Sequence, residues 1–224
     1  MADIAVVHNK FETRGGAEVV CMHTIDALQN AGHDISLYSF DEPDFKMLNK
    51  FCGTDVDPVP VWTPKRVGPG VNNSIVYLQD LTDGRIGPHI KLKTAILSRL
   101  IFSKLEGYDL SISTSSEIAL PRNGVQYIHF PRFNNRYQQS PWGANGLKET
   151  VYDTLCTRLG MIDTNTIQRS KLITNSKWTA DIIYTRYGIR PSVIPPPVLT
   201  DQFSDVPWNN REFGFVSIGR IAPD

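Results

Sequence analysis

The stretch Asp3-Ile-Ala-Val-Val-His8 is a short apolar run rich in β-branched residues. Such a run is typical of a parallel strand that is buried on both faces of a sheet. A polar loop containing Gly15 and Gly16 follows, and apolar residues then recur at helical spacing over residues 17–31. A second apolar run covers residues 34–40. Strand, glycine loop, helix and strand in this order predict a βαβ unit with a right-handed parallel crossover.

Strand and helix patterns continue to alternate along the rest of the chain. Prolines and glycines between residues 55 and 73 favour loops with at most a short strand. Beyond them we expect helices over 90–105, 147–170 and 176–187, and strands over 108–113, 125–130, 171–174 and 192–195. This order predicts an α/β domain with a doubly wound, mainly parallel, Rossmann-like sheet, which binds ligands at the carboxyl ends of its strands.

The charge balance and the cysteines exclude several classes of protein. The 224 residues include 23 Lys and Arg and 23 Asp and Glu, so the formal net charge is zero and binding of nucleic acid through bulk charge is not expected. No stretch approaches the roughly 20 apolar residues of a membrane span, and the N-terminus does not read as a signal peptide. The three cysteines lie far apart, so we expect neither a disulfide framework nor a metal site.

Gly15 and Gly16 stand at the junction between the first strand and the first helix. Glycines there let the backbone approach a ligand closely, and the unpaired N–H groups of a helix N-terminus favour a phosphate. The segment is neither a G-x-G-x-x-G fingerprint nor a P-loop. The alternative is a tight turn that needs a positive φ, and the motif alone leaves both interpretations open.

His129 lies near the end of the strand expected over 125–130, just before a proline turn. A histidine at this edge of a parallel sheet can donate to a hydroxyl or pyrophosphate oxygen, or act as an acid or base. The alternative is a histidine held by backbone carbonyls, which is the commoner case for a single histidine. His8, at the end of the first strand, faces the same edge and carries less weight in this interpretation.

Four motifs, taken in order, resemble those of family 4 glycosyltransferases. They are Gly-Gly-Ala-Glu at 15–18, Tyr127-Ile-His-Phe-Pro131, Asn175-Ser-Lys-Trp-Thr179, and Val193-Ile-Pro-Pro-Pro-Val198 followed by Ser217-Ile-Gly-Arg-Ile-Ala-Pro-Asp224. The resemblance covers the whole chain and is nearest to the dolichol-oligosaccharide mannosyltransferase type. It implies the GT-B architecture, in which two Rossmann-like domains face each other, the N-terminal one holding the acceptor and the C-terminal one the nucleotide-sugar donor. It also implies transfer with retention of configuration and without a metal ion or other cofactor.

The resemblance implies roles for five residues. Gly15 and Gly16 would contact the donor diphosphate or the transferred sugar, and Glu18 would face the acceptor. His129 would contact the reacting sugar as the catalytic residue, and Arg220 would pair with the diphosphate. In the family a lysine and a Glu-x7-Glu pair follow further on, and this sequence ends before both.

We therefore expect an acceptor-side domain over 1–198, and a linker with the first strand (213–218) of a missing donor-binding domain over 199–224. The expected function is transfer of a mannosyl or other hexosyl group from a UDP- or GDP-sugar to a sugar or lipid-linked acceptor. The expected location is the cytoplasm, with peripheral contact at the cytoplasmic membrane face as an option. We expect the 224-residue chain to be inactive alone and to bind nucleotide-sugars only at millimolar Kd until the missing domain is supplied, fused or in trans.

Two other functions are alternatives to this one. A non-catalytic carbohydrate- or partner-binding module, arising from a split or degenerate glycosyltransferase, fits the same motifs. An epimerase with a single Rossmann domain is disfavoured, because the sequence lacks both a G-x-x-G-x-x-G loop and a Tyr-x-x-x-Lys pair. The basic residues of the helix expected over 90–105 do not gather on one face, so a packed helix is favoured over a membrane-surface helix.

Overall fold

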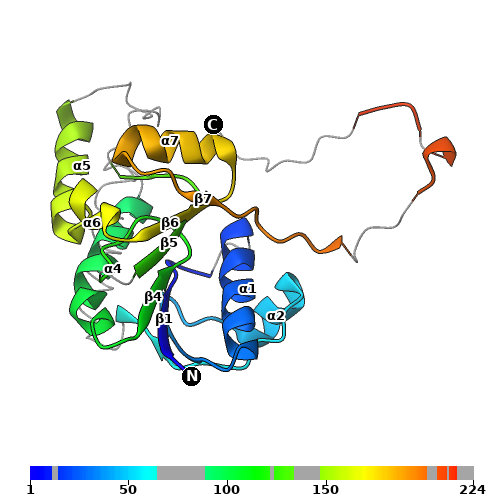
Figure 1. The fold of residues 1–224 in the computed structure, drawn as a ribbon, viewed down its shortest axis with the longest axis horizontal. Helices are drawn as coiled ribbons and strands as arrows, with labels where there is room; N and C mark the ends of the chain where they lie inside the picture. Colours follow the sequence, from blue (N-terminus) through cyan, green and yellow to red (C-terminus); the bar gives the residue numbers. More distant parts are fainter. Residues whose placement is uncertain are drawn as a thin grey trace.

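The computed structural model describes residues 1–11, 15–64, 89–121, 124–133, 147–200, 206–210 and 212–215. They form a seven-stranded sheet between layers of helices (Figure 1). The strands are β1 (Asp3–Val7), β2 (Asp34–Tyr38), β3 (Val61–Trp62), β4 (Leu110–Ser113), β5 (Gly124–Ile128), β6 (Lys171–Thr174) and β7 (Ser192–Val193). The helices are α1 (Gly16–Asn30), α2 (Phe45–Cys52), α4 (His89–Leu105), α5 (Leu147–Gly160), α6 (Thr164–Gln168) and α7 (Lys177–Tyr187), with a short 3-10 turn at Trp208–Asn210.

The sheet is parallel throughout, with strand order β3-β2-β1-β4-β5-β6-β7. The chain runs outward from β1 to β3, returns through α4 to place β4 against the other side of β1, and runs outward again to β7. Ile4 of β1 therefore pairs with Ile35 of β2 on one side and with Leu110 of β4 on the other. This is the predicted doubly wound, Rossmann-like sheet, and that prediction is confirmed.

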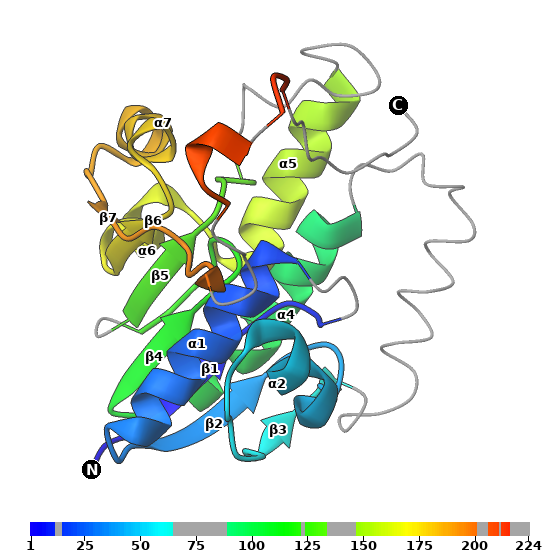
Figure 2. The ribbon, with the colours of Figure 1, turned by 90° about the vertical axis from the view of Figure 1, so that its right-hand side faces the viewer.

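Strand β1 is buried on both faces, as its continuous apolar run predicts. Ile4 and Val6 pack in a core with α1 and α2, whereas Ala5 and Val7 pack in a separate core with α4. A third core lies under α5, α6 and α7, around Ile128 and Leu172 of the sheet. Figure 2, turned by 90°, shows α1 and α2 in front of the strands and α4 behind them.

The prediction of a single helix over 147–170 is wrong, because the chain forms two helices there, α5 and α6. Met161 takes a left-handed conformation (φ 56°) that ends α5. The side chain of Asp163 then caps a new helix, α6, by accepting a hydrogen bond from Thr166 N at 2.7 Å. Because methionine carries no signal for a left-handed turn, the sequence pattern predicts one long helix where the chain forms two.

Several other expected boundaries change in the structure. Helix α2 was not expected, although Asp44 caps it and Gly53 ends it in the left-handed region. Strands β2, β5 and β7 end earlier than predicted, at Tyr38, Ile128 and Val193. No strand forms over 213–215, where Phe213 and Phe215 are fully exposed and so lack the pairing partners that a buried strand needs; residues 216–218 lie outside the described residues.

The helices and the cysteines bear on two classes that the sequence disfavours, membrane-spanning proteins and disulfide-linked proteins. No helix in the described part of the chain is long and apolar enough to cross a membrane. The three cysteines are buried free thiols, as expected from their separation in the sequence.

The close approach of α4 and α5 at Gly160 gives a test of this packing. A Cβ atom on Gly160 would lie 2.9 Å from Ala95 Cα and 2.8 Å from Ile162 Cδ1, where no atom can fit without a backbone shift. We expect Gly160→Ala to lower the free energy of unfolding by about 1–3 kcal/mol, the usual cost of overpacking a core. Urea unfolding measures the change. Gly107→Ala is the matched control, because its Cβ would lie at an ordinary 3.8 Å from Lys104 O; equal midpoints for the two variants would contradict the packing.

Candidate functional site

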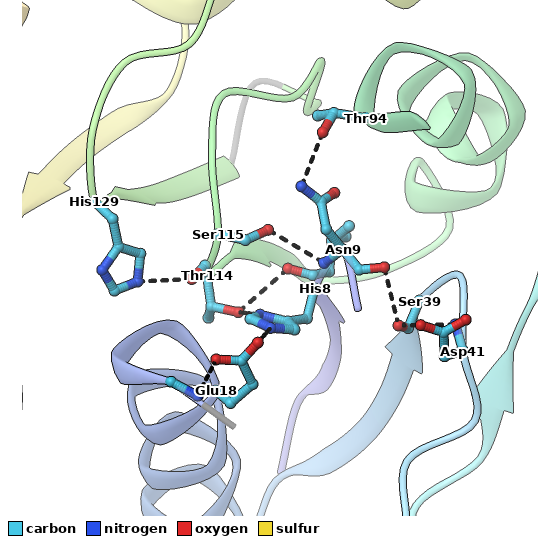
Figure 3. Close-up of polar contacts among 11 residues, drawn as sticks. His8, Asn9, Glu18, Ser39, Asp41, Thr94, Thr114, Ser115 and His129 are labelled. Carbon is cyan, nitrogen blue, oxygen red and sulfur yellow. Dashed lines mark hydrogen bonds and ion pairs between the residues drawn. The ribbon is translucent and has the colours of Figure 1, made fainter. Parts of the chain in front are cut away.

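Polar side chains gather at the carboxyl edge of the sheet where β1 and β4 lie side by side (Figure 3). The order of the strands reverses between these two strands, so the loops that follow them lead to opposite sides of the sheet. In open α/β sheets this reversal is the usual place for a ligand. The loops after β1, β4 and β5 and the N-terminus of α1 all contribute residues there.

His8, the first residue after β1, is almost completely buried and bridges the loops of β1 and β4. Its Nδ1 lies 3.0 Å from Thr114 Oγ1. The Thr114 hydroxyl donates its own proton to the carbonyl oxygen of Val7, at 3.3 Å. The Thr114 oxygen therefore accepts from His8, so Nδ1 of His8 carries a proton.

The other ring nitrogen of His8 faces a carboxylate. Nε2 lies 3.9 Å from Oε1 of Glu18, and both side chains are buried. Burial by itself lowers the pKa of His8, but interactions with Cys21 and with Glu18 outweigh burial and raise the pKa to about 9. With Nδ1 already protonated, His8 is a buried cation beside a buried anion at neutral pH.

Glu18 also fixes the start of α1. Its Oε2 accepts a hydrogen bond at 2.8 Å from the backbone N–H of Gly15, the N-cap residue of this helix. One residue thus joins the first turn of α1 to the end of β1. Glu18 lies at the predicted edge of the sheet, but its carboxylate is turned toward Gly15 and His8 (Figure 3).

Gly15 and Gly16 do not form the tight turn with positive φ that was the alternative interpretation of the pair. Gly15 is the N-cap of α1 in an extended conformation (φ −123°), and Gly16 is the first residue of the helix. A Cβ atom added to Gly16 would meet no atom of the described residues within 4 Å. Space for a ligand therefore lies beside the first turn of α1, where unpaired N–H groups and the helix dipole favour an anion.

His129 follows β5 directly and joins the same cluster through Thr114. Its Nε2 lies 3.2 Å from the carbonyl oxygen of Thr114, which can only accept, so Nε2 carries the proton. Nδ1 of His129 is then a lone-pair acceptor, with no hydrogen-bond partner among the residues that the structure describes. Burial lowers the pKa of His129 despite the hydrogen bond to Thr114, and the nearby His8 and Arg132 charges lower it further. The ring is therefore neutral at neutral pH.

Asn9 holds the loop after β1 in place. Its side-chain amide donates to Thr94 Oγ1 of α4 at 2.8 Å, and its backbone N–H donates to Ser115 Oγ at 3.2 Å. Its carbonyl oxygen accepts from Ser39, the residue after β2. The loops after three adjacent strands are thus connected by one residue, which keeps the cluster rigid.

Glu117 ties the loop after β4 to the loop after β5, and its role could not be seen in the sequence. The carboxylate is completely buried and accepts from the backbone N–H groups of Arg132 and Phe133, at 3.0 and 3.3 Å. It also accepts from the hydroxyls of Ser116 and Tyr187, at 2.7 and 2.8 Å. Four donors from separate parts of the chain thus surround the buried carboxylate and fix the segment that follows His129.

The structure brings together four of the five residues predicted for the site: Gly15, Gly16, Glu18 and His129. Arg220, the fifth, lies outside the described residues. His8, which the sequence places at the same edge with less weight, is a member of the cluster, and Thr114 was not predicted. Among the described residues, no group of three or more His, Cys, Asp or Glu side chains could hold a metal ion.

No protein-family model matches the chain, and no sequence among the curated proteins matches it. Among solved structures the chain is similar to HepE from Anabaena, in complex with UDP and glucose, with 15% identity and a TM-score of 0.44 over 92% of this chain and 47% of that chain. It is similar to a glycosyltransferase from Rickettsia africae, with 14% identity and a TM-score of 0.38 over 89% and 44%. It is also similar to the E. coli heptosyltransferase WaaC with ADP-2-deoxy-2-fluoro heptose, with 10% identity and a TM-score of 0.25 over 88% and 77%. The chain spans less than half the length of the first two solved chains.

The buried pair of His8 and Glu18 predicts a stability that depends on pH. The folded pKa of His8 is about 9 and the ordinary value is 6.5, so the folded state binds one more proton between these values. The stabilisation is complete below about pH 6 and is lost as the pH rises through 9. We expect His8→Gln to lower the free energy of unfolding more at about pH 6 than at about pH 10, as measured by urea unfolding.

The control for this experiment is Asn49→Ala, which removes a side chain without a titratable group that accepts a hydrogen bond from Val56 N at 3.0 Å. It should give the same difference at both values of pH. A His8→Gln effect that does not change with pH would contradict the protonated state of His8.

Proposed function

We propose that this chain is the acceptor-side domain of a GT-B glycosyltransferase that uses a nucleotide-sugar donor. One observation carries the proposal: Glu18, His8, Thr114 and His129 form a continuous series of contacts at the carboxyl edge of the sheet, where β1 and β4 part. Residues as far apart in the sequence as His8 and His129 meet there. Two of them, Glu18 and His129, belong to the motifs on which the family resemblance rests.

His129 supplies a neutral acceptor at this edge. Its Nε2–H is committed to Thr114 O, which fixes the plane of the ring and leaves Nδ1 with its lone pair. Because burial lowers the pKa of His129, the lone pair remains unprotonated at neutral pH. We propose that Nδ1 accepts a hydrogen bond from a hydroxyl of the reacting sugar or of the acceptor and so orients that group.

The first turn of α1 supplies the anion-binding part of the proposed site. Gly16 leaves open space beside the helix N-terminus, where the donor diphosphate would lie against backbone N–H groups. As the diphosphate leaves, negative charge develops on it, and the helix dipole stabilises that charge without a metal ion. We propose that Arg220 adds a charged donor to the same group, as the family resemblance implies.

Glu18 takes a different part in this proposal from the one its motif suggests. Its carboxylate caps α1 and stabilises the His8 cation, so it acts on the acceptor through the position of the helix. We propose residues 1–198 as the acceptor-side domain and 199–224 as the start of the connection to the donor-binding domain. Transfer with retention of configuration is part of the proposal and follows from the resemblance.

The full-length protein with its donor-binding domain tests the proposed role of His129. We expect His129→Ala to lower kcat/KM by about 100-fold or more, the scale for one positioned polar group in a transition state. His33→Ala, at the opposite edge of the sheet, should leave kcat/KM unchanged. A loss of less than about threefold in His129→Ala would reduce this residue to a structural histidine.

A second variant in the same assay probes the first turn of α1. Gly16→Val should abolish transfer while circular dichroism remains that of the folded protein, because the first atom of the added side chain meets no atom of the described residues within 4 Å. Turnover equal to that of the unaltered protein would mean that no ligand group lies beside Gly16.

A further inference from the structure

An aromatic pair, made by the exposed Trp178 and the half-buried Phe130, includes the neighbour of His129 in the chain. Trp178, in the first turn of α7, is 65% exposed, and its ring stacks on that of Phe130 with centroids 5.9 Å apart and planes 23° from parallel. Phe130 is the residue directly after His129. The indole of Trp178 has no hydrogen-bond partner in the described part of the chain, so its N–H remains available as a donor.

The two rings are held in a fixed relation by the backbone from which they project. Asn175 donates from its side-chain amide to the carbonyl oxygen of His129 at 3.0 Å, and its Oδ1 accepts from Thr179 Oγ1 at 2.8 Å. Ser176 caps α7 by accepting from Thr179 N at 3.2 Å. The start of α7 is thus fastened to the end of β5, and the aromatic pair is preorganised rather than assembled on binding.

The pair makes a small apolar face within polar surroundings. On α7, Lys177 precedes Trp178 and is exposed, and Asp181 is exposed and paired with Arg190 at 3.0 Å. A stable protein–protein interface buries roughly 800 Å² on each partner, far more than two side chains offer. The apolar face is about as large as one ring and has hydrogen-bonding groups at its edge. Its size therefore fits a single sugar ring better than a protein surface.

We propose that Phe130 and Trp178 form a stacking platform for a pyranose ring of the acceptor. One face of a pyranose carries mainly C–H groups, which the negative face of an aromatic ring attracts, and the hydroxyls around the ring remain free for hydrogen bonds. Binding there brings the sugar beside His129, whose Nδ1 accepts from a hydroxyl. The identification of this sugar as the acceptor rests on the proposed function; the binding of a pyranose ring does not.

Binding can be measured on the 224-residue chain without any assay of transfer. The probes are the methyl glycosides of mannose, glucose and N-acetylglucosamine and their disaccharides, added to about 100 mM, where a site with millimolar Kd would be filled. We expect at least one probe to shift the indole N–H resonance of Trp178 in proton–nitrogen NMR spectra. Trp178→Ala should weaken binding of that probe by about tenfold or more.

The matched control for the binding experiment is Tyr184→Ala, on the same helix. Tyr184 is also an exposed aromatic residue, but it lies against Arg190, away from Phe130. This variant should bind the probe as the unaltered chain does. Absence of any Trp178 shift with every probe, or equal binding by Trp178→Ala, would overturn the platform.

The full-length protein separates failure of the platform from failure of the proposed function. We expect Trp178→Ala to raise the acceptor KM about tenfold and to leave the donor KM unchanged. Sugar binding at Trp178 in a full-length protein that transfers no sugar would refute the glycosyltransferase proposal and keep the platform. Active transfer with an unaltered acceptor KM in Trp178→Ala would keep the function and refute the platform. A Trp178 resonance that shifts when the donor-binding domain is added, but with none of the sugar probes, would also refute the platform.

Discussion

The hydrogen bond between His8 and Thr114 joins the ends of β1 and β4, where the order of the strands in the sheet reverses. The architecture of this chain depends on that reversal. The parallel sheet is built outward from β1 to β3 and then continues on the other side of β1 with β4. That return places the ends of β1 and β4 side by side and sends their loops apart, which leaves backbone and side-chain polar groups at the edge. His8 and Thr114 satisfy one another there, and Glu18 and His129 join them from α1 and β5.

The same cluster holds two histidines in opposite protonation states, and the cause is the partner of each ring. Burial lowers the pKa of His8, but its interactions with Cys21 and with Glu18 outweigh burial and raise it. Burial lowers the pKa of His129 more than the Thr114 carbonyl and the charge on Glu18 raise it. The charge on His8 contributes to this fall and so helps to keep His129 neutral. A neutral histidine beside a helix N-terminus is suited to hydrogen bonding with hydroxyls rather than to binding anions itself.

Much of the sheet could be predicted from local pattern because each strand is a short apolar run and most helices end at glycine. Gly188, for example, has a φ of 70° and ends α7 at the expected residue. The break at Met161 could not be predicted, since it depends on a left-handed residue that carries no sequence signal. The same limit applies to the site: strand ends and a glycine pair indicated Gly15, Gly16 and His129. The role of Glu117 could not be predicted, because its hydrogen-bond donors at 132, 133 and 187 come together only in the folded chain.

The central claim is that the edge between β1 and β4 is where this chain receives a sugar nucleotide and a glycan. Amide chemical-shift mapping of the 224-residue chain with UDP-glucose, GDP-mannose and the methyl glycosides tests it most directly, because weak binding suffices for a shift. The predicted result is a set of shifts at Asn9, Gly16, Thr114 and His129, with residues at the opposite edge, such as Asp34 and Asp109, unmoved. Shifts confined to that opposite edge, or no shift with any of these ligands at about 100 mM, would contradict it.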